Sequence, residues 1–168
     1  QWSSSAASDV YKRQVQVSDT KKNIIFAEKA EYNKNNELMR SFGITDIITS
    51  EKFRIQGENI FYDNKKGIIY SKSNTVITDI NGNQIFLDMF DYSTEKKMFF
   101  SQGDIEVQDT KTNSYLFSEI YIDEKNRKIV GSDVKSFLND NSFKVDERNE
   151  PRFFANAAVI SEDGVTFQ

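Results

Sequence analysis

Apolar and polar residues alternate along the chain, and the alternation repeats every thirty residues. Four related segments start thirty residues apart: AEKAEYN at Ala27, GENIFYD at Gly57, LDMFDYS at Leu87 and FSEIYID at Phe117. Two columns of this repeat are largely apolar: Ala30, Ile60, Phe90 and Ile120, then Tyr32, Tyr62, Tyr92 and Ile122. Residues two apart share one face of a strand, so the pattern predicts β-strands.

The second strand of each thirty-residue unit has in-register columns of its own. Two are apolar: Met39, Ile69, Phe99 and Ile129, then Ile47, Ile77, Val107 and Phe137. Between them lies a column of small residues: Ser41, Ser71, Ser101 and Gly131. Small residues in mid-strand are typical of a bulge or a bend, so we expect the sheet to bend along this line.

Turn-forming residues recur about every fifteen residues and leave strands of about ten, roughly 33 Å long at 3.3 Å per residue. One turn, Asn81-Gly82, has the pair favoured in type I′ hairpins. The chain is therefore expected to be all-β: a rolled or folded antiparallel sheet, or β-jellyroll, of about four two-strand repeats. We expect one sheet folded like a V around an elongated apolar interior.

Residues 1–14 do not share this pattern. They read QWSSSAASDVYKRQ and contain the only tryptophan, Trp2. The string resembles the translation of a sequencing-library adapter, and the alternative is a natural disordered N-terminus. We therefore expect one domain over residues 15–168.

Composition narrows the possible functions. Apolar residues make up 38% of the chain and aromatic residues 13%, which favours strands with one apolar and one solvated face. The chain has no His and no Cys, which excludes thiol chemistry, His-based catalysis and Cys-ligated zinc. We predict no enzyme activity, no cofactor and no metal site. The net charge of −4, with both signs interspersed, argues against a nucleic-acid partner.

One acidic column needs its own interpretation. Glu28, Glu58 and Asp88 lie thirty residues apart, and stacked carboxylates could bind a cation or catalyse. The column ends at Ser118 and has no His beside it, so solvated positions near strand ends explain it better. Arg152 and the Lys residues show no clustering in the sequence that would indicate a phosphate site.

The repeats resemble the OstA-type repeat of the lipopolysaccharide-transport proteins. In that repeat a small residue and an acid, as at Ala27-Glu28 and Gly57-Glu58, precede alternating apolar residues, and a Gly-led strand follows, as at Gly43 and Gly103. The motif decays toward the fourth unit. Asn149-Glu150-Pro151-Arg152 breaks the thirty-residue register, and with the strand after it resembles the end of the N-terminal domain in the LptD family of LPS-assembly proteins. The resemblance covers residues 24–168.

This resemblance implies a periplasmic domain at the inner face of the outer membrane of a Gram-negative bacterium. Such a domain accepts lipopolysaccharide from an LptA-type bridge jellyroll and passes its acyl chains toward its own β-barrel, which here would follow the chain and which a plug lipoprotein partners. We predict a lipid-binding groove from the apolar columns: Ala30, Tyr32, Met39, Ile47, Ile60, Tyr62, Ile69, Ile77, Phe90, Tyr92, Phe99, Val107, Ile120, Ile122, Ile129 and Phe137. We also predict that residues 24–32, with Ile24, Phe26 and Glu28, form the edge strand to which the bridge adds.

Two alternatives stay open. For any single groove residue, such as Ile69 or Phe99, an ordinary core position is the better explanation, and the two interpretations agree if the core is an open-ended cleft. The hydroxyls of Tyr32, Tyr62 and Tyr92 either reach the rim of the groove or belong to plain cross-strand packing. The chain is alternatively an LptA/LptC-like bridge component, or a structural β-solenoid module that binds no lipid.

Overall fold

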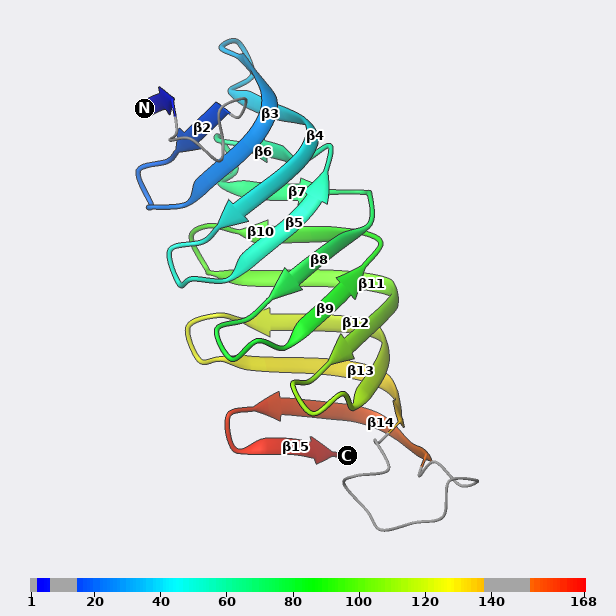
Figure 1. The fold of residues 1–168 in the computed structure, drawn as a ribbon. Coiled ribbons are helices and arrows are strands. Elements are labelled where there is room, and N and C mark those ends of the chain that lie inside the picture. The colour runs from blue at the N-terminus through cyan, green and yellow to red at the C-terminus, as the bar shows by residue number, and fades with distance from the viewer. Residues whose placement is uncertain (1–2, 7–14, 138–151) are drawn as a thin grey trace.

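The computed structural model describes residues 3–6, 15–137 and 152–168, and it is a single antiparallel sheet that runs from the N-terminus at one end to the C-terminus at the other (Figure 1). For residues 3–6, 152 and 153 only the backbone is described. The strands are β1 Ser3–Ala6, β2 Val15–Ser18, β3 Ile24–Asn33, β4 Leu38–Ile48, β5 Arg54–Glu58, β6 Phe61–Asp63, β7 Ile68–Ser71, β8 Thr75–Thr78, β9 Gln84–Leu87, β10 Phe90–Ser93, β11 Met98–Gln108, β12 Ser114–Asp123, β13 Lys128–Phe137, β14 Arg152–Ser161 and β15 Gly164–Phe167. Within these ranges no helix is long and apolar enough to cross a membrane. The predicted all-β antiparallel fold is confirmed.

The sheet is folded over into two layers, because the long strands change direction near their midpoints. The pairing of β3 with β4 is interrupted between Ala27 and Lys29, and that of β11 with β12 between Gln102 and Ile105. In the other repeats one strand ends at the bend and a new strand begins in the other layer, as β6 follows β5 and β10 follows β9. Layer A consists of β2, β5, β8, β9 and the halves of β3, β4, β11, β12 and β13 paired with them. Layer B consists of β6, β7, β10, β15 and the remaining halves, with the second half of β14.

The inward side chains form one straight row in each layer. Cross-strand partners in layer A are, in order, Val17, Ile25, Ile47, Ile55, Ile77, Ile85, Val107, Tyr115 and Ser136. Those in layer B are Tyr32, Met39, Tyr62, Ile69, Tyr92, Phe99, Ile122, Ile129, Ile160 and Val165. The rows face each other, as the rings of Phe53 and Phe99 do at 6.2 Å between centroids. Their apolar members from Val17 to Ile160, apart from the exposed Tyr32, belong to one connected core.

The small-residue column lies at the bend, as predicted. Ser41, Ser71 and Ser101 are buried there, and each donates a side-chain hydrogen bond to a backbone carbonyl where the sheet folds over. The bond from Ser101 Oγ to Met89 O is 2.6 Å long. A buried carbonyl that leaves its ladder needs another donor, and a short hydroxyl side chain supplies it without adding bulk. The serine column therefore stabilises the bend.

The turns opposite the bend repeat one hydrogen-bonded design. Oδ1 of Asp79 accepts from the backbone N–H groups of Asn81 and Asn83, and Oδ2 accepts from Asn83 Nδ2 at 2.7 Å. Asp19 and Asp109 do the same in their own turns. The type I′ prediction for Asn81-Gly82 is wrong: only Gly82 has a positive φ (90°), because the five-residue turn closes as a type I turn followed by a left-handed residue.

Two expectations about the ends of the sheet have different outcomes. The predicted edge at residues 24–32 is wrong for Ile24 and Phe26, because β2 pairs with β3 over Ile24–Ala27. Beyond Ala27, β3 pairs with β4 alone among the described residues, so the edge is shorter and starts at Glu28. The register break at Asn149-Glu150-Pro151-Arg152 lies, apart from the backbone of Arg152, outside the described residues.

Candidate functional site

The space between the two layers is the site that the sequence columns predict. Thirteen of the sixteen predicted groove residues are buried, and they lie in the connected core rather than along an open channel. Ile47, Ile60, Ile69, Ile77 and Phe90 have no exposed surface at all. Side chains from the two layers fill the interior, so a ligand reaches these residues only if the layers separate.

Three predicted groove residues lie elsewhere. Ala30 is half-buried against the core, and Tyr32 is 41% exposed at the end of β3. Phe137 is half-buried and faces outward, because the inward positions of β13 after the bend are Val134 and Ser136. Across the bend the inward positions of β13 are three residues apart, at Gly131 and Val134, and its register with β12 and β14 stays constant. In β11 the register shifts at the bend and the inward positions are four residues apart, at Ser101 and Ile105, so the thirty-residue column does not extend to Phe137.

Opposite the bend, the turns of layer A meet the turns of layer B along a line that we call the seam. Two of the predicted tyrosines reach it. Tyr62 donates from its hydroxyl to Asp19 Oδ2 at 2.9 Å, and Tyr92 donates to Glu124 Oε2 at 2.7 Å. Burial raises the pKa of both phenols, and the facing carboxylates raise it further. Their rings belong to the core while their hydroxyls bind polar groups at its margin.

Glu124 is the most unusual residue of the seam. It follows β12 in a polar turn, yet it is only 2% exposed. Its carboxylate accepts hydrogen bonds from Thr49 Oγ1 and Tyr92 OH, both at 2.7 Å. Burial raises its pKa to about 7, although these two hydrogen bonds favour the ionised form. Sequence reasoning missed this residue because its turn resembles an ordinary solvated one.

Thr49 comes from a turn that departs from the Asp design of its neighbours. In the other layer A turns an Asp and an Asn occupy the first and fifth positions, but here Thr49 and Phe53 do. Thr49 Oγ1 accepts from Phe53 N at 3.1 Å, and its own hydroxyl proton is then directed to Glu124. Phe53 is 2% exposed and packs on Phe99. The turn that departs from the repeat is therefore the one that contacts the buried Glu124 carboxylate across the seam.

Further polar contacts close the seam on both sides of this point. Lys97 forms an ion pair with Glu51 across it, and Lys21 Nζ donates to Thr94 Oγ1 at 3.1 Å. Thr94 is buried and itself donates to Gly67 O. These contacts are hydrogen bonds and ion pairs at a solvent boundary, and such contacts open at a lower free-energy cost than a packed core.

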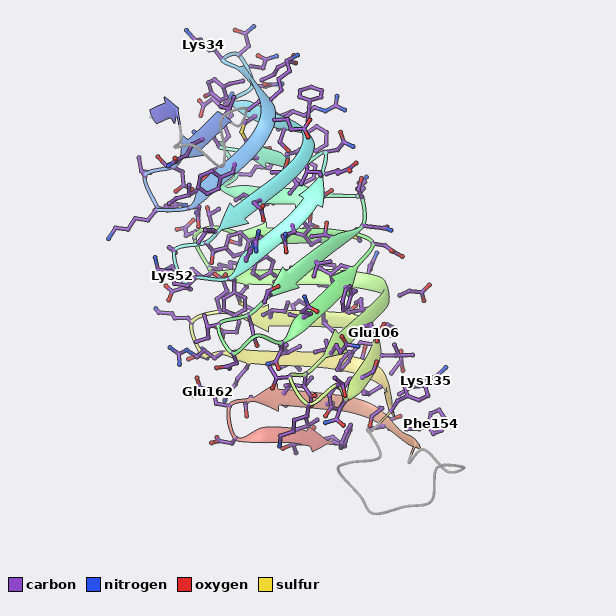
Figure 2. All side chains as sticks on the ribbon, viewed as in Figure 1. Lys34, Lys52, Glu106, Lys135, Phe154 and Glu162 are labelled. Carbon is purple, nitrogen blue, oxygen red and sulfur yellow. The ribbon has the colours of Figure 1, made fainter. Side chains whose placement is uncertain are left out.

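The fold also concentrates basic residues that look scattered in the sequence. Thirteen lie in or next to the turns of the seam: Lys21, Lys22, Lys34, Lys52, Arg54, Lys65, Lys66, Lys96, Lys97, Lys111, Lys125, Arg127 and Lys128. Five lie elsewhere in the described ranges: Lys29, Arg40, Lys72, Lys135 and Arg152. Figure 2 shows Lys52 on the turn side and Lys135 on the bend side. Most of the basic residues that are scattered in the sequence therefore share one side of the fold, together with acidic turn residues such as Asp19, Glu51 and Glu95.

The acidic column lies on the opposite side of the molecule. Glu28, Glu58 and Asp88 are exposed at the outside of the bend. Among the described residues no three His, Cys, Asp or Glu side chains come together as a metal site would require. A cleft of about 560 Å³ opens near the same bend, lined by residues such as Leu87, Ile105 and Phe117.

Comparisons with known proteins bear on the fold. No family model matches the chain, and no curated protein matches it either. Among solved structures, the chain is similar to LptH of Pseudomonas aeruginosa, described as the LptA-homologous periplasmic component of the conserved lipopolysaccharide transport device. The two share 11% sequence identity at a TM-score of 0.56, over 79% of this chain and 93% of that one. A second match, the TCP domain of Drosophila melanogaster SAS-4, has 7% identity over 92% of this chain and 96% of that one. Its TM-score of 0.21 supports no conclusion.

The match to LptH covers most of both chains. At 11% identity it bears on architecture only. The chain therefore has the β-jellyroll fold of the LptA type.

Proposed function

We propose that this protein is a periplasmic lipid-conduit domain that accepts lipopolysaccharide and passes its acyl chains between the two layers toward the outer membrane. Within that role we assign it to the N-terminal domain of an LptD-type assembly protein. The domain does no chemistry and uses no cofactor. The LptA-type fold supports the general role, and the resemblance at Asn149–Arg152 supports the specific assignment.

The observation that carries the proposal is the pair of continuous apolar rows. The layer B row passes from Met39 to Ile160 without a charged residue, and the layer A row does so from Val17 to Tyr115. An acyl chain placed between them would meet apolar side chains along the whole sheet. Each buried methylene contributes about 0.8 kcal/mol, so several chains are held without any polar group. A smooth, uncharged path also lets the chains move on.

Loading requires the layers to separate, because the interior is filled by the protein's own side chains. The bend is held by backbone ladders and by the serine column, whereas the seam is held by polar side-chain contacts. We infer that the layers part at the seam and hinge at the bend. Lipid then replaces the contacts that the two rows make with each other.

Site-specific photo-crosslinking tests this function. A photoreactive residue replaces Phe99, which points inward, or its neighbour Phe100, which points outward from the same strand. In cells that make lipopolysaccharide we expect adducts from position 99 and none from position 100. Position 69 provides a second inward site. If no inward position gives an adduct, the conduit function is wrong and a structural module remains.

The bridge-component alternative is supported by the fold match, since LptH is itself described as LptA-homologous. The coding sequence after Gln168 distinguishes a bridge component from the N-terminal domain of an LptD-type protein. Segments of about ten residues with alternating hydrophobicity and flanking aromatic residues would indicate the barrel of an LptD-type protein. If no such segments follow, the bridge assignment replaces it.

For the partner we propose that an LptA-type bridge jellyroll adds to β3 beyond Ala27, where β3 pairs with β4 alone among the described residues. Unpaired strand edges accept a further strand through backbone hydrogen bonds. Size-exclusion chromatography of a mixture with such a jellyroll should show a heterodimer. Two separate peaks at high micromolar concentration would contradict this pairing.

A further inference from the structure

One carboxylate at the seam contacts one basic side chain and lies near the charges of two others. Glu51 lies in the β4–β5 turn of layer A and forms an ion pair with Lys97 of the β10–β11 turn in layer B. The Lys97 hydrogen bond lowers the pKa of Glu51, and the nearby charges of Lys125 and Arg127 lower it further. These two residues belong to the β12–β13 turn, whose Glu124 is bonded to Thr49, two residues before Glu51.

The turns of layer B share one backbone conformation. Glu37, Gly67, Lys97 and Arg127 occupy the same turn position thirty residues apart, with positive φ angles of 54°, 64°, 55° and 53°. The turn itself therefore sets the left-handed angle, and glycine is the residue that this angle favours. Glycine is accordingly a substitution that keeps the backbone conformation at positions 97 and 127.

The cluster lies directly above the point where the apolar interior begins. Thr49 and Glu124 meet at 2.7 Å beside it, and beneath them Phe53 and Tyr92 pack on the ring of Phe99, with Tyr92 at 4.3 Å between centroids. A molecule with an anionic group at the cluster would therefore have its apolar part next to the core. This arrangement suits an amphiphile with a phosphorylated head group.

We propose that Lys97, Lys125 and Arg127 form a binding site for a phosphate group on the head of an amphiphile, and that the carboxylate of Glu51 occupies this site in the free protein. The phosphate site stands on these contacts alone. The passage of the acyl chain between the layers rests on the proposed conduit function.

The other charges near the cluster have both signs. Arg127 is also paired with Glu162 at 2.5 Å, and Glu95 and Asp123 lie in the same two turns. A phosphate monoester carries between one and two negative charges at pH 7 and offers three acceptor oxygens. It can therefore bind more than one of the cations, whereas the carboxylate of Glu51 binds Lys97. Lys96 and Lys128, both exposed, add positive charge around the site.

A matched pair of amphiphiles tests the site by isothermal titration calorimetry on the full chain. Dodecyl phosphate and dodecyl maltoside carry the same alkyl chain, and both are used below their critical micelle concentrations. We expect dodecyl phosphate to bind the wild type about tenfold more tightly, as one or two charge-assisted hydrogen bonds would give. Inorganic pyrophosphate, which has no alkyl chain, should compete with dodecyl phosphate and remove this tenfold preference.

Glycine variants remove the cations without damaging the fold. Lys97→Gly with Arg127→Gly should abolish the tenfold preference, leave dodecyl maltoside binding unchanged, and give an equal or higher melting temperature because backbone strain is relieved. Lys22→Gly is the control, since Lys22 has a left-handed backbone of φ 69° in a turn outside the cluster. It should keep the preference.

Removal of the resident carboxylate should have the opposite effect. Glu51→Gln vacates the site and should tighten dodecyl phosphate binding several-fold. Glu95→Gln removes the same charge from an exposed position in a neighbouring turn and should change it little. Equal strengthening by both variants would mean that net charge alone acts, and would overturn the assigned role of Glu51.

The two hypotheses fail differently. Equal affinity of the wild type for both amphiphiles, with no competition by pyrophosphate, overturns the phosphate site and leaves the conduit intact. Absence of binding by either amphiphile, with pyrophosphate still bound and lost in the double glycine variant, supports the site and contradicts the conduit.

Discussion

Thr49 and Glu124 lie 75 residues apart in the sequence, and Thr49 Oγ1 donates a hydrogen bond of 2.7 Å to the buried Glu124 carboxylate. The bond joins a turn of layer A to a turn of layer B. It leaves a carboxylate inside the protein with two hydroxyl donors and no cation bonded to it among the described contacts. An acid in this position makes the stability of the seam depend on pH.

Glu124→Gln should remove a pH dependence of stability. The pKa of Glu124 in the fold is about 7, above its ordinary value of 4.5, so its contribution is fully present below pH 4.5 and is lost as the pH rises through 7. The free energy of unfolding of the wild type should fall by roughly 3 kcal/mol over this range. Urea denaturation at pH 4.5, 6 and 8 measures it. The variant should show a flatter profile, and identical profiles for both proteins would disprove the assignment.

Tyr92→Phe should destabilise the protein more at pH 8 than at pH 5. The change removes one of the two hydroxyl donors to Glu124 while keeping the ring that stacks on Phe99 at 4.3 Å. A buried carboxylate that loses a partner costs about 1–3 kcal/mol when it is ionised. Chemical denaturation at the two pH values gives the difference. Tyr121→Phe, on the exposed outer face, is the control and should have little effect at either pH.

Gly131→Ala should destabilise the fold through overpacking. A Cβ on Gly131 would lie 2.1 Å from Cδ1 of the buried Phe117 and 2.9 Å from Cγ2 of Ile120. Forcing a methyl group into a packed site costs about 1–3 kcal/mol. The melting temperature of the variant should drop, and Phe117→Leu in the same chain should restore part of it. Without such recovery, the Phe117 contact would not be the cause.

Thr112→Gly should stabilise the protein. Thr112 is β-branched and has a φ of 65°, a conformation that its side chain strongly disfavours, and Gly82 occupies the equivalent turn position one unit earlier. We expect a gain of about 1 kcal/mol, seen as a higher denaturation midpoint at unchanged slope. Gly82→Thr is the reciprocal variant and should lose a similar amount. A loss of stability in Thr112→Gly would contradict this explanation.

The sequence predicted the architecture because its period and its alternation are both consequences of the sheet. Ser41, Ser71 and Ser101 indicated the bend before any coordinate was known, and the apolar columns located the core. Phe137 lies off the predicted face because β13 crosses the bend in three residues, from Gly131 to Val134, whereas β11 takes four, from Ser101 to Ile105. A column of residue types at a fixed period does not record this one-residue difference.

The seam was not predictable in the same way. Lys97, Arg127 and Glu51 each look like solvated turn residues, and only the folding of the sheet brings them together. Glu124 was missed for the same reason. In the column of Lys34, Asn64, Thr94 and Glu124 the first two residues are exposed and the last two are buried, and the polarity of the residues does not show this change.

The backbone ladders of the sheet join segments that are near each other in the sequence, whereas the side-chain bonds of the seam join distant segments. This difference favours one order of assembly. Most backbone ladders join consecutive strands, so their hairpins close short loops at little entropic cost, and the others, such as β5 with β8, join strands of adjacent repeats. The side-chain bonds of the seam span much longer loops: 43 residues from Asp19 to Tyr62, 73 from Lys21 to Thr94 and 75 from Thr49 to Glu124. The sheet can therefore zip up hairpin by hairpin as an open trough, and only the completed trough can close along its length. A protein that folds in this order would pass, on its way to the native state, through the same open form that the proposed conduit function requires.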